Sequence, residues 1–113
     1  MSSSAQDLTM NYNTSQHELE ELVIARQKLE TQLQENKIVQ DEFDGLREET
    51  QVYKLTGNVL LPVEQFEAKS NVSKRLEFIT AEINRCEENI KTKQGLLEKL
   101  RAELLQTQQA RQQ

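Results

Sequence analysis

Few side chains in this sequence could carry chemistry, and those few are scattered. Cys86 is the only cysteine and His17 the only histidine, so the sequence holds no set of ligands with the spacing of a metal site. The three glycines, Gly45, Gly57 and Gly95, are isolated and cannot form a loop that cradles phosphate. No nucleophile stands beside a base. We therefore expect no catalytic residue, no metal and no cofactor, and no direct part for ATP.

The acidic side chains form two short clusters. Glu18, Glu20 and Glu21 make up one, and Glu87 and Glu88 make up the other. On a helix such clusters are usually solvated faces. Part of their charge is balanced by nearby lysines, namely Lys91, Lys93 and Lys99. Docking of these acids to a basic surface of a partner stays open as the alternative.

Composition limits the chain to one domain, residues 1–113, with a small core. The sequence has 113 residues, of which 35% are hydrophobic and 4% aromatic. So few apolar residues cannot fill the core of an ordinary compact globule. The formal charge of -5, from 14 basic and 19 acidic residues, and the absence of a basic cluster argue against nucleic acid as a partner.

No segment of the sequence suits a membrane. The longest apolar run, 59–63, is far short of the roughly 18 residues that cross a bilayer. The first residues lack the pattern of a signal peptide, and a single cysteine cannot form an internal disulfide. We expect a soluble, intracellular protein.

Two long stretches follow an unbroken alternation of four and three residues, which is the pattern of a heptad seam. The seam positions of the N-terminal half are Leu8, Tyr12, Ser15, Leu19, Leu22, Arg26, Leu29, Leu33, Asn36, Gln40 and Phe43. Those of the C-terminal half are Val72, Leu76, Ile79, Ile83, Cys86, Ile90, Lys93, Leu97, Leu100, Leu104 and Thr107. The pattern predicts two helices with frayed ends, about 8–49 and about 63–110, each burying one narrow stripe against the other.

Between the helices, β-branched and aromatic residues concentrate in 52–63. Gly57 and Asn58 offer a two-residue turn of the type II′ kind, with glycine first. The predicted hairpin residues are Val52, Tyr53, Leu55, Gly57, Asn58, Val59, Leu60, Leu61 and Val63. The turn sets the cross-strand pairs as Thr56/Val59, Leu55/Leu60, Lys54/Leu61, Tyr53/Pro62 and Val52/Val63.

The predicted fold is mainly α, a long antiparallel two-helix coiled coil joined by a single β-hairpin. Each helix would be on the order of 60 Å long, which makes the molecule a rod. The predicted seam layers are Phe43/Val72, Leu33/Ile83, Leu29/Cys86, Leu19/Leu97 and Tyr12/Leu104. Polar seam residues such as Arg26, Asn36 and Lys93 weaken the seam and fix its register.

Two boundaries depend on single residues. Gly45 could end the first helix, but the good helix formers 46–49 follow it, so we expect the helix to continue to about Glu49. Pro62 is tolerated at the end of an edge strand or in the first turn of a helix. It therefore marks the entry of the second helix.

The hairpin is apolar on both faces, and a lone two-stranded ribbon is marginal in water with open edges. We expect hairpins from several chains to join into a shared sheet or barrel. The alternative is that the helices fold over the hairpin and cover it. A narrow heptad stripe is used up by the partner helix, so we favour assembly.

Four stretches appear in a recognisable order around the single hairpin. They are ELEE at 18–21, ARQKLETQLQEN at 25–36, VYKLTGNVL at 52–60 and KRLEFI at 74–79. In these stretches the chain resembles the β-type subunits of the prefoldin family. The resemblance covers nearly the whole chain. The serine-rich start, 1–10, and the polar tail, 106–113, depart from what we expect of the family.

The resemblance implies a function. Prefoldin is a hexamer of two α-type and four β-type chains, so the implied partners are two α-type and three further β-type subunits. The hairpins would form a double β-barrel platform from which six coiled coils project. The complex would capture non-native proteins, notably actin and tubulin, without ATP and deliver them to the cytosolic group II chaperonin. The implied compartment is the cytoplasm, with a nuclear pool left open.

The predicted client-binding tip lies at the end of the coil remote from the hairpin. Its residues are Leu8, Met10, Tyr12, Leu104 and Leu105. We interpret Tyr12 and Leu104 as closing the last coiled-coil layer, whereas Met10 and Leu105 lie off the seam and are free to contact clients. Cys86 is predicted to be a core residue and His17 a solvated one.

The main rival to a chaperone subunit is a structural or tethering coiled coil. A spacer needs only a tight polar turn between its helices, whereas this chain has about a dozen sheet-forming residues there. The hairpin therefore favours the assembly platform.

Overall fold

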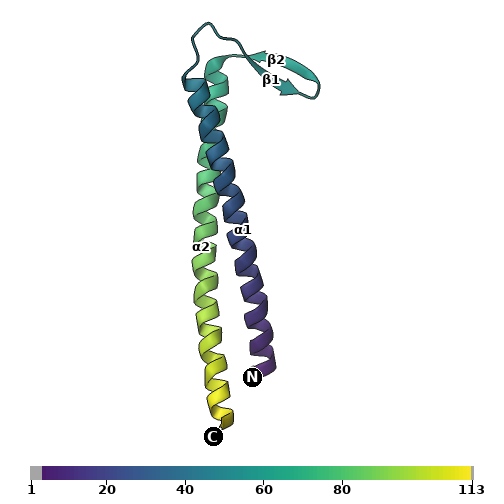
Figure 1. The fold of residues 1–113 in the computed structure, drawn as a ribbon, viewed down its shortest axis with the longest axis vertical. Coiled ribbons are helices and arrows are strands. Elements are labelled where there is room, and N and C mark those ends of the chain that lie inside the picture. Colours follow the sequence, from purple (N-terminus) through teal and green to yellow (C-terminus); the bar gives the residue numbers. More distant parts are fainter. Residues whose placement is uncertain (1–3, 113) are drawn as a thin grey trace. The chain divides into compact units, whose positions relative to one another are not determined.

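The computed structural model describes residues 4–112, which form two helices and two strands in the order α1, β1, β2, α2 (Figure 1). Helix α1 spans Ala5–Asp44 and helix α2 spans Gln65–Gln112. Strand β1 spans Val52–Thr56 and strand β2 spans Val59–Val63. The predicted fold class, two long helices joined by one hairpin, is confirmed. The first three residues of the serine-rich start and the last residue of the polar tail lie outside the described residues.

Helix α1 begins at a serine cap. The Asp7 N–H donates a hydrogen bond to the Ser4 hydroxyl oxygen at 3.1 Å, and the Leu8 N–H donates to the Ser4 carbonyl at 3.0 Å. A serine side chain satisfies an otherwise unpaired N–H of the first turn, and Asp7 suits the positive end of the helix dipole. The cap explains why the helix starts slightly before Leu8.

Helix α1 ends at Asp44, so the prediction that it continues to about Glu49 was wrong. The Leu46 N–H bonds the Phe43 carbonyl at 3.2 Å, a tight turn that closes the helix. Gly45 weakens the helix at this point by about 1 kcal/mol relative to alanine. The helix formers after Gly45 could not offset this cost, because the following loop has hydrogen bonds of its own.

The loop between α1 and β1 is fixed by one glutamine of α2. The Gln65 side-chain amide donates to the Arg47 carbonyl at 2.6 Å and to the Thr50 carbonyl at 2.8 Å. The Thr50 N–H in turn donates to the Arg47 carbonyl at 3.1 Å, which makes 47–50 a turn. The loop therefore satisfies its backbone groups without continuing the helix.

The hairpin has the predicted register. Strands β1 and β2 are antiparallel, and the facing pairs are Val52/Val63, Tyr53/Pro62, Lys54/Leu61, Leu55/Leu60 and Thr56/Val59. Gly57 has a φ of 62°, and no other described residue has a positive φ. A positive φ at the first turn residue alone is the pattern of a type II′ turn, which glycine adopts without a Cβ penalty.

Pro62 lies in β2, next to the last residue of the strand, rather than in the helix. Helix α2 starts at Gln65, slightly later than the predicted 63, and the Ala68 N–H donates to the Glu64 carbonyl at 3.0 Å. Pro62 therefore belongs to an edge strand, which is one of the two settings we expected for it.

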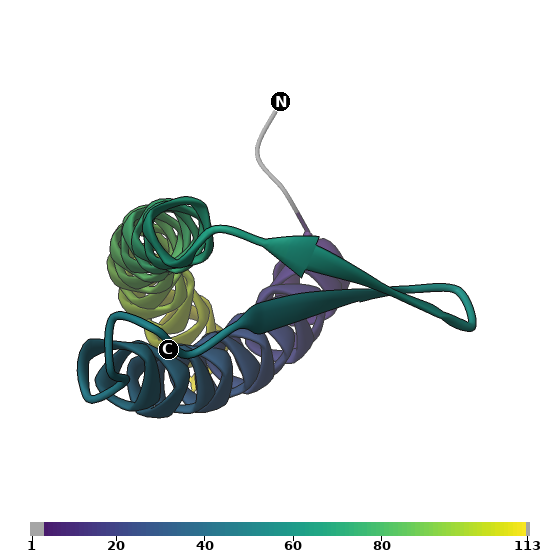
Figure 2. The ribbon, with the colours of Figure 1, turned by 90° about the horizontal axis from the view of Figure 1, so that it is seen from above.

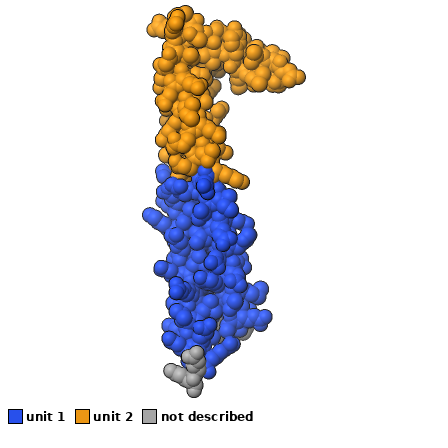
Figure 3. Space-filling view, in the orientation of Figure 1, with its two compact units in different colours: residues 1–27, 84–113 blue, residues 28–83 orange. Residues whose placement is uncertain are grey.

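The chain divides into two compact units (Figure 3). One comprises residues 1–27 and 84–113, and the other comprises 28–83. Within each unit a segment of α1 lies antiparallel to a segment of α2, and every predicted seam position is buried or half-buried. The most buried side chains are Leu8, Ser15, Ala68, Val72, Ile79, Ile83, Cys86 and Leu100. No helix in the described part of the chain is long and apolar enough to cross a membrane.

Candidate functional site

The hairpin carries the densest group of exposed apolar side chains. Figure 2 shows β1 and β2 reaching away from the helix ends of their own unit. Side chains of facing residues share a face and alternate along each strand, so the register divides the hairpin into two faces. The apolar face consists of Tyr53, Leu55, Leu60 and Pro62. The mixed face consists of Val52, Lys54, Thr56, Val59, Leu61 and Val63.

Exposure differs along these faces. Leu55 is 68% exposed and Leu60 is 61% exposed, and Tyr53 and Pro62 are also exposed. On the mixed face, Leu61 and Val59 are exposed near the turn, whereas the base residues Val52 and Val63 are half-buried. The helices therefore cover only the base of the hairpin, and the alternative in which they fold over all of it does not hold.

A groove of about 460 Å³ lies between the hairpin base and the helix ends of the 28–83 unit. Its lining residues are Val39, Phe43, Val52, Tyr53, Lys54, Val63, Ala68, Asn71, Val72 and Arg75. The predicted layer of Phe43 and Val72 thus lies next to Val52 and Val63. The groove joins the last layer of the coil to the base of the hairpin, where it is bordered by Val52, Lys54 and Val63 of the mixed face and by Tyr53 of the apolar face.

Both outer edges of the hairpin are unpaired among the described residues, since the sheet contains β1 and β2 only. Unpaired edges present rows of N–H and C=O groups that can pair with a further strand. Together with the exposed apolar side chains, these edges make the hairpin the candidate surface for assembly.

Sequence reasoning missed how the base of the hairpin is held. The Gln51 side-chain amide donates to the Val52 carbonyl at 2.9 Å and to the Val63 carbonyl at 3.2 Å, which ties the two strands together at their open end. Gln65 performs the equivalent task in the preceding loop. With 14 glutamines in the chain, no spacing distinguishes these two from the rest.

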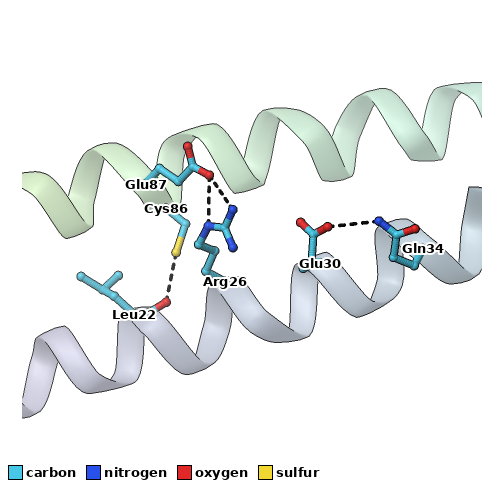
Figure 4. Close-up of polar contacts among 6 residues, drawn as sticks. All are labelled: Leu22, Arg26, Glu30, Gln34, Cys86 and Glu87. Atoms are coloured by element: carbon cyan, nitrogen blue, oxygen red, sulfur yellow. Dashed lines mark hydrogen bonds and ion pairs between the residues drawn. The ribbon is translucent and has the colours of Figure 1, made fainter.

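In the 1–27 and 84–113 unit, two of the seam cations pair with acids of the opposite helix. The Arg26 guanidinium donates to one Glu87 carboxylate oxygen from Nε at 3.0 Å and from Nη2 at 2.7 Å (Figure 4). The Lys93 ammonium lies 2.5 Å from Glu18 Oε2. Glu18 and Glu87 therefore pair with the opposite helix, whereas we interpreted their clusters as solvated faces. A seam cation opposite an acid that flanks the other seam is the signal that could have revealed these pairs.

Cys86 and His17, the only cysteine and histidine, each contact a neighbouring protein group. The Cys86 thiol is buried and donates to the Leu22 carbonyl at 3.2 Å (Figure 4). His17 is exposed, with Nε2 3.0 Å from Glu21 Oε1 one turn along the same helix. In the described part of the chain, no three His, Cys, Asp or Glu side chains lie where they could hold a metal ion.

The predicted client-binding residues fall into two groups. Met10 is 61% exposed and Leu105 is also exposed, so both are accessible at the end of the unit that carries the termini. Leu8 is buried, and Tyr12 and Leu104 are half-buried, so these three pack in the coil. The structure thus leaves Met10 and Leu105 as the accessible part of the predicted tip.

Other exposed apolar residues on the helices were not singled out from the sequence. They are Val23, Ile24, Ile38, Phe66, Phe78 and Leu96. Their common signal, which was available, is an apolar side chain at an off-seam position of a heptad.

Comparisons with known proteins agree with this geometry. The family model described as "Prefoldin subunit" matches residues 6–111. The chain belongs to the prefoldin subunit family. It is therefore a subunit of a chaperone and not an enzyme, as expected from the sequence.

Among known proteins, this chain is similar to prefoldin subunit 6 of several organisms. The chain is 68% identical over 99 residues to prefoldin subunit 6 of Saccharomyces cerevisiae, covering 88% of this chain and 87% of that one. It is 43% identical over 98 residues to prefoldin subunit 6 of Mus musculus, covering 87% and 77% of the two chains. Among the β-type prefoldins, the sequence stretches 18–21, 25–36, 52–60 and 74–79 predict a chain most similar to subunit 6. These two matches confirm that prediction.

A solved structure supports the fold. The prefoldin β subunit from Thermococcus strain KS-1 superposes with a TM-score of 0.82 at 24% sequence identity, over 88% of each chain. The single hairpin between two helices is thus shared with a β-type prefoldin.

Proposed function

We propose that this chain occupies a β-type position in a prefoldin hexamer, with two α-type and three further β-type subunits as partners. Its hairpin would supply two strands to a shared β-barrel platform. The observation that carries the proposal is the hairpin itself, in which Leu55 and Leu60 are exposed and both edges are unpaired. Burial of such side chains releases roughly 25 cal/mol per Å² of apolar surface, and edge pairing satisfies the free backbone groups.

The proposed activity is ATP-independent capture of non-native proteins, with actin and tubulin as clients, and their delivery to the cytosolic group II chaperonin. Met10 and Leu105 support the capture step, because they are exposed at the end of the coil that carries the termini. A methionine adapts to irregular apolar surfaces. Several weak contacts on different subunits would act together and raise the overall affinity for one client. The proposed compartment is the cytoplasm.

The first experiment tests assembly. The mass of the purified chain would be measured by light scattering on a sizing column, alone and after mixing with α-type and β-type prefoldin subunits. A mass near six subunits in the mixture is the expected result. A monomer or dimer that ignores these partners would contradict the proposal and favour a structural or tethering coiled coil.

A second experiment tests capture. Substitution of Met10 and Leu105 by serine should weaken suppression of actin aggregation by the assembled hexamer, because it removes the exposed apolar groups of this subunit. Ile38→Ser is the matched control, since Ile38 is similarly exposed but lies in the other unit. Equal loss with Ile38→Ser, or no loss with the double variant, would contradict the assignment of the tip.

A further inference from the structure

The two faces of the hairpin are not equivalent, and we infer that assembly buries the apolar face while the mixed face remains turned to this chain's own helices. The surface that meets the apolar face would be the corresponding face of a hairpin from another prefoldin subunit. This inference deepens the proposed function, on which it rests, by assigning the interior of the shared sheet to Tyr53, Leu55, Leu60 and Pro62.

The side chains of the two faces differ in polarity. All four members of the apolar face lack a charge, and all are exposed. The mixed face places Lys54 opposite Leu61 and Thr56 opposite Val59. Burial of a lysine ammonium without a partner is very costly. The apolar face can therefore enter a dry interior, whereas the mixed face cannot do so along its whole length unless another chain supplies a partner for Lys54.

The mixed face is also partly occupied already. Val52 and Val63 at its base line the groove together with Phe43 and Val72, and both valines are half-buried. A neighbouring hairpin that packed along the whole of this face would have to displace the end of the coil at its base, although Val59 and Leu61 near the turn are exposed. On the apolar face, only Tyr53 borders this groove, whereas Leu55 is 68% exposed and Leu60 is 61% exposed.

The backbone favours the same arrangement. In a hairpin with a two-residue turn, the closing pair Thr56/Val59 exchanges hydrogen bonds and the next pair, Leu55/Leu60, does not. The N–H and C=O groups of Leu55 and Leu60 therefore point to the outer edges. A neighbouring strand that pairs there continues the alternation of side chains, so its residues beside Leu55 and Leu60 project from the same face of the sheet.

Adjacent leucines allow a matched test. Leu60 is 61% exposed on the apolar face and Leu61 is 47% exposed on the mixed face. Leu60→Asp should weaken assembly with the other prefoldin subunits by roughly 100-fold, the scale expected when a carboxylate must enter an apolar interior. Leu61→Asp should weaken it by less than about 10-fold. Circular dichroism of each free variant should show the same helical content as the parent chain.

Equal loss in the two variants, or a larger loss for Leu61→Asp, would overturn the assignment of the faces. Failure of the parent chain to assemble with any prefoldin subunit would instead contradict the proposed function. The two failures are therefore distinguishable in one set of light-scattering measurements.

A labelling experiment avoids the introduced charge. Leu60→Cys and Leu61→Cys would each be made in a Cys86→Ala background, assembled with partner subunits and exposed to a maleimide. Mass spectrometry of this chain should show that assembly slows modification at position 60, because a buried thiol is inert, and changes it little at position 61. Protection at position 61 but not at 60 would refute the inference.

Discussion

The coil and the hairpin use the same kinds of apolar side chain with opposite results. In the coil, Ile79 is 3% exposed, and every predicted seam position is buried or half-buried. In the hairpin, Leu55 and Leu60 remain open on the apolar face. The helix pair thus buries its apolar stripe within one chain, whereas the apolar face of the hairpin stays exposed and a lone two-stranded ribbon is marginal in water. Under the proposed function, other chains would cover it.

The largest expected effect is on assembly alone. Tyr53→Asp should weaken hexamer formation by roughly 100-fold or more, as expected for Leu60→Asp, because Tyr53 lies on the apolar face and a carboxylate there resists burial. Helical content should stay largely intact, since Tyr53 lies in β1 and meets the coil only where it borders the groove at its end. Light scattering and circular dichroism measure the two properties. Loss of helicity together with assembly would mean that the coil depends on the platform. It would contradict the view that the coil is stable within one chain.

The next effect is on the coil alone. Ile79→Ala should lower the free energy of unfolding by about 2–4 kcal/mol, through lost burial and the cavity that remains. Urea denaturation followed by circular dichroism measures the change. Ile38→Ala, at an exposed position of the other helix, should cost less than about 0.5 kcal/mol. Similar costs for the two isoleucines would show that the seam does not carry the stability.

A smaller effect is expected at the turn. Gly57 has a φ of 62°, and no atom lies within 4 Å of the place that a Cβ would occupy. Gly57→Ala should therefore cost about 1 kcal/mol through backbone conformation alone. The apparent dissociation constant of the hexamer should rise roughly fivefold. Asn58→Ala, at a residue without positive φ, should change it by less than about twofold. An equal effect at the two positions would argue against a type II′ turn.

The smallest effect is expected at the ion pair between Arg26 and Glu87. Both side chains are partly exposed, and exposed pairs contribute about 0.2–1 kcal/mol. A double-mutant cycle with Arg26→Gln and Glu87→Gln should give a coupling energy in this range that declines in high salt. A coupling unchanged by salt would show that the pair is shielded from solvent.

Periodicity predicted most of this fold, and it failed where side chains bond to distant backbone. The heptad positions and the hairpin register follow from side-chain alternation, which is a local property. The end of α1 at Asp44 depends on the bonds from Gln65 to Arg47 and Thr50, which join residues well separated in sequence. At the tip the sequence nominated Leu8 together with Met10, and only the packing of the two helices separates the buried leucine from the exposed methionine.

Pro62 makes the two outer edges of the hairpin different. Pro62 faces Tyr53 in a pair whose backbone groups point outward, and proline has no N–H. The outer edge of β2 therefore offers one donor fewer than the outer edge of β1. A strand that pairs with β1 finds a full set of hydrogen bonds, whereas one that pairs with β2 leaves a carbonyl unmatched. In the proposed assembly, two otherwise similar neighbours would therefore bind the two edges of the same hairpin with unequal affinity.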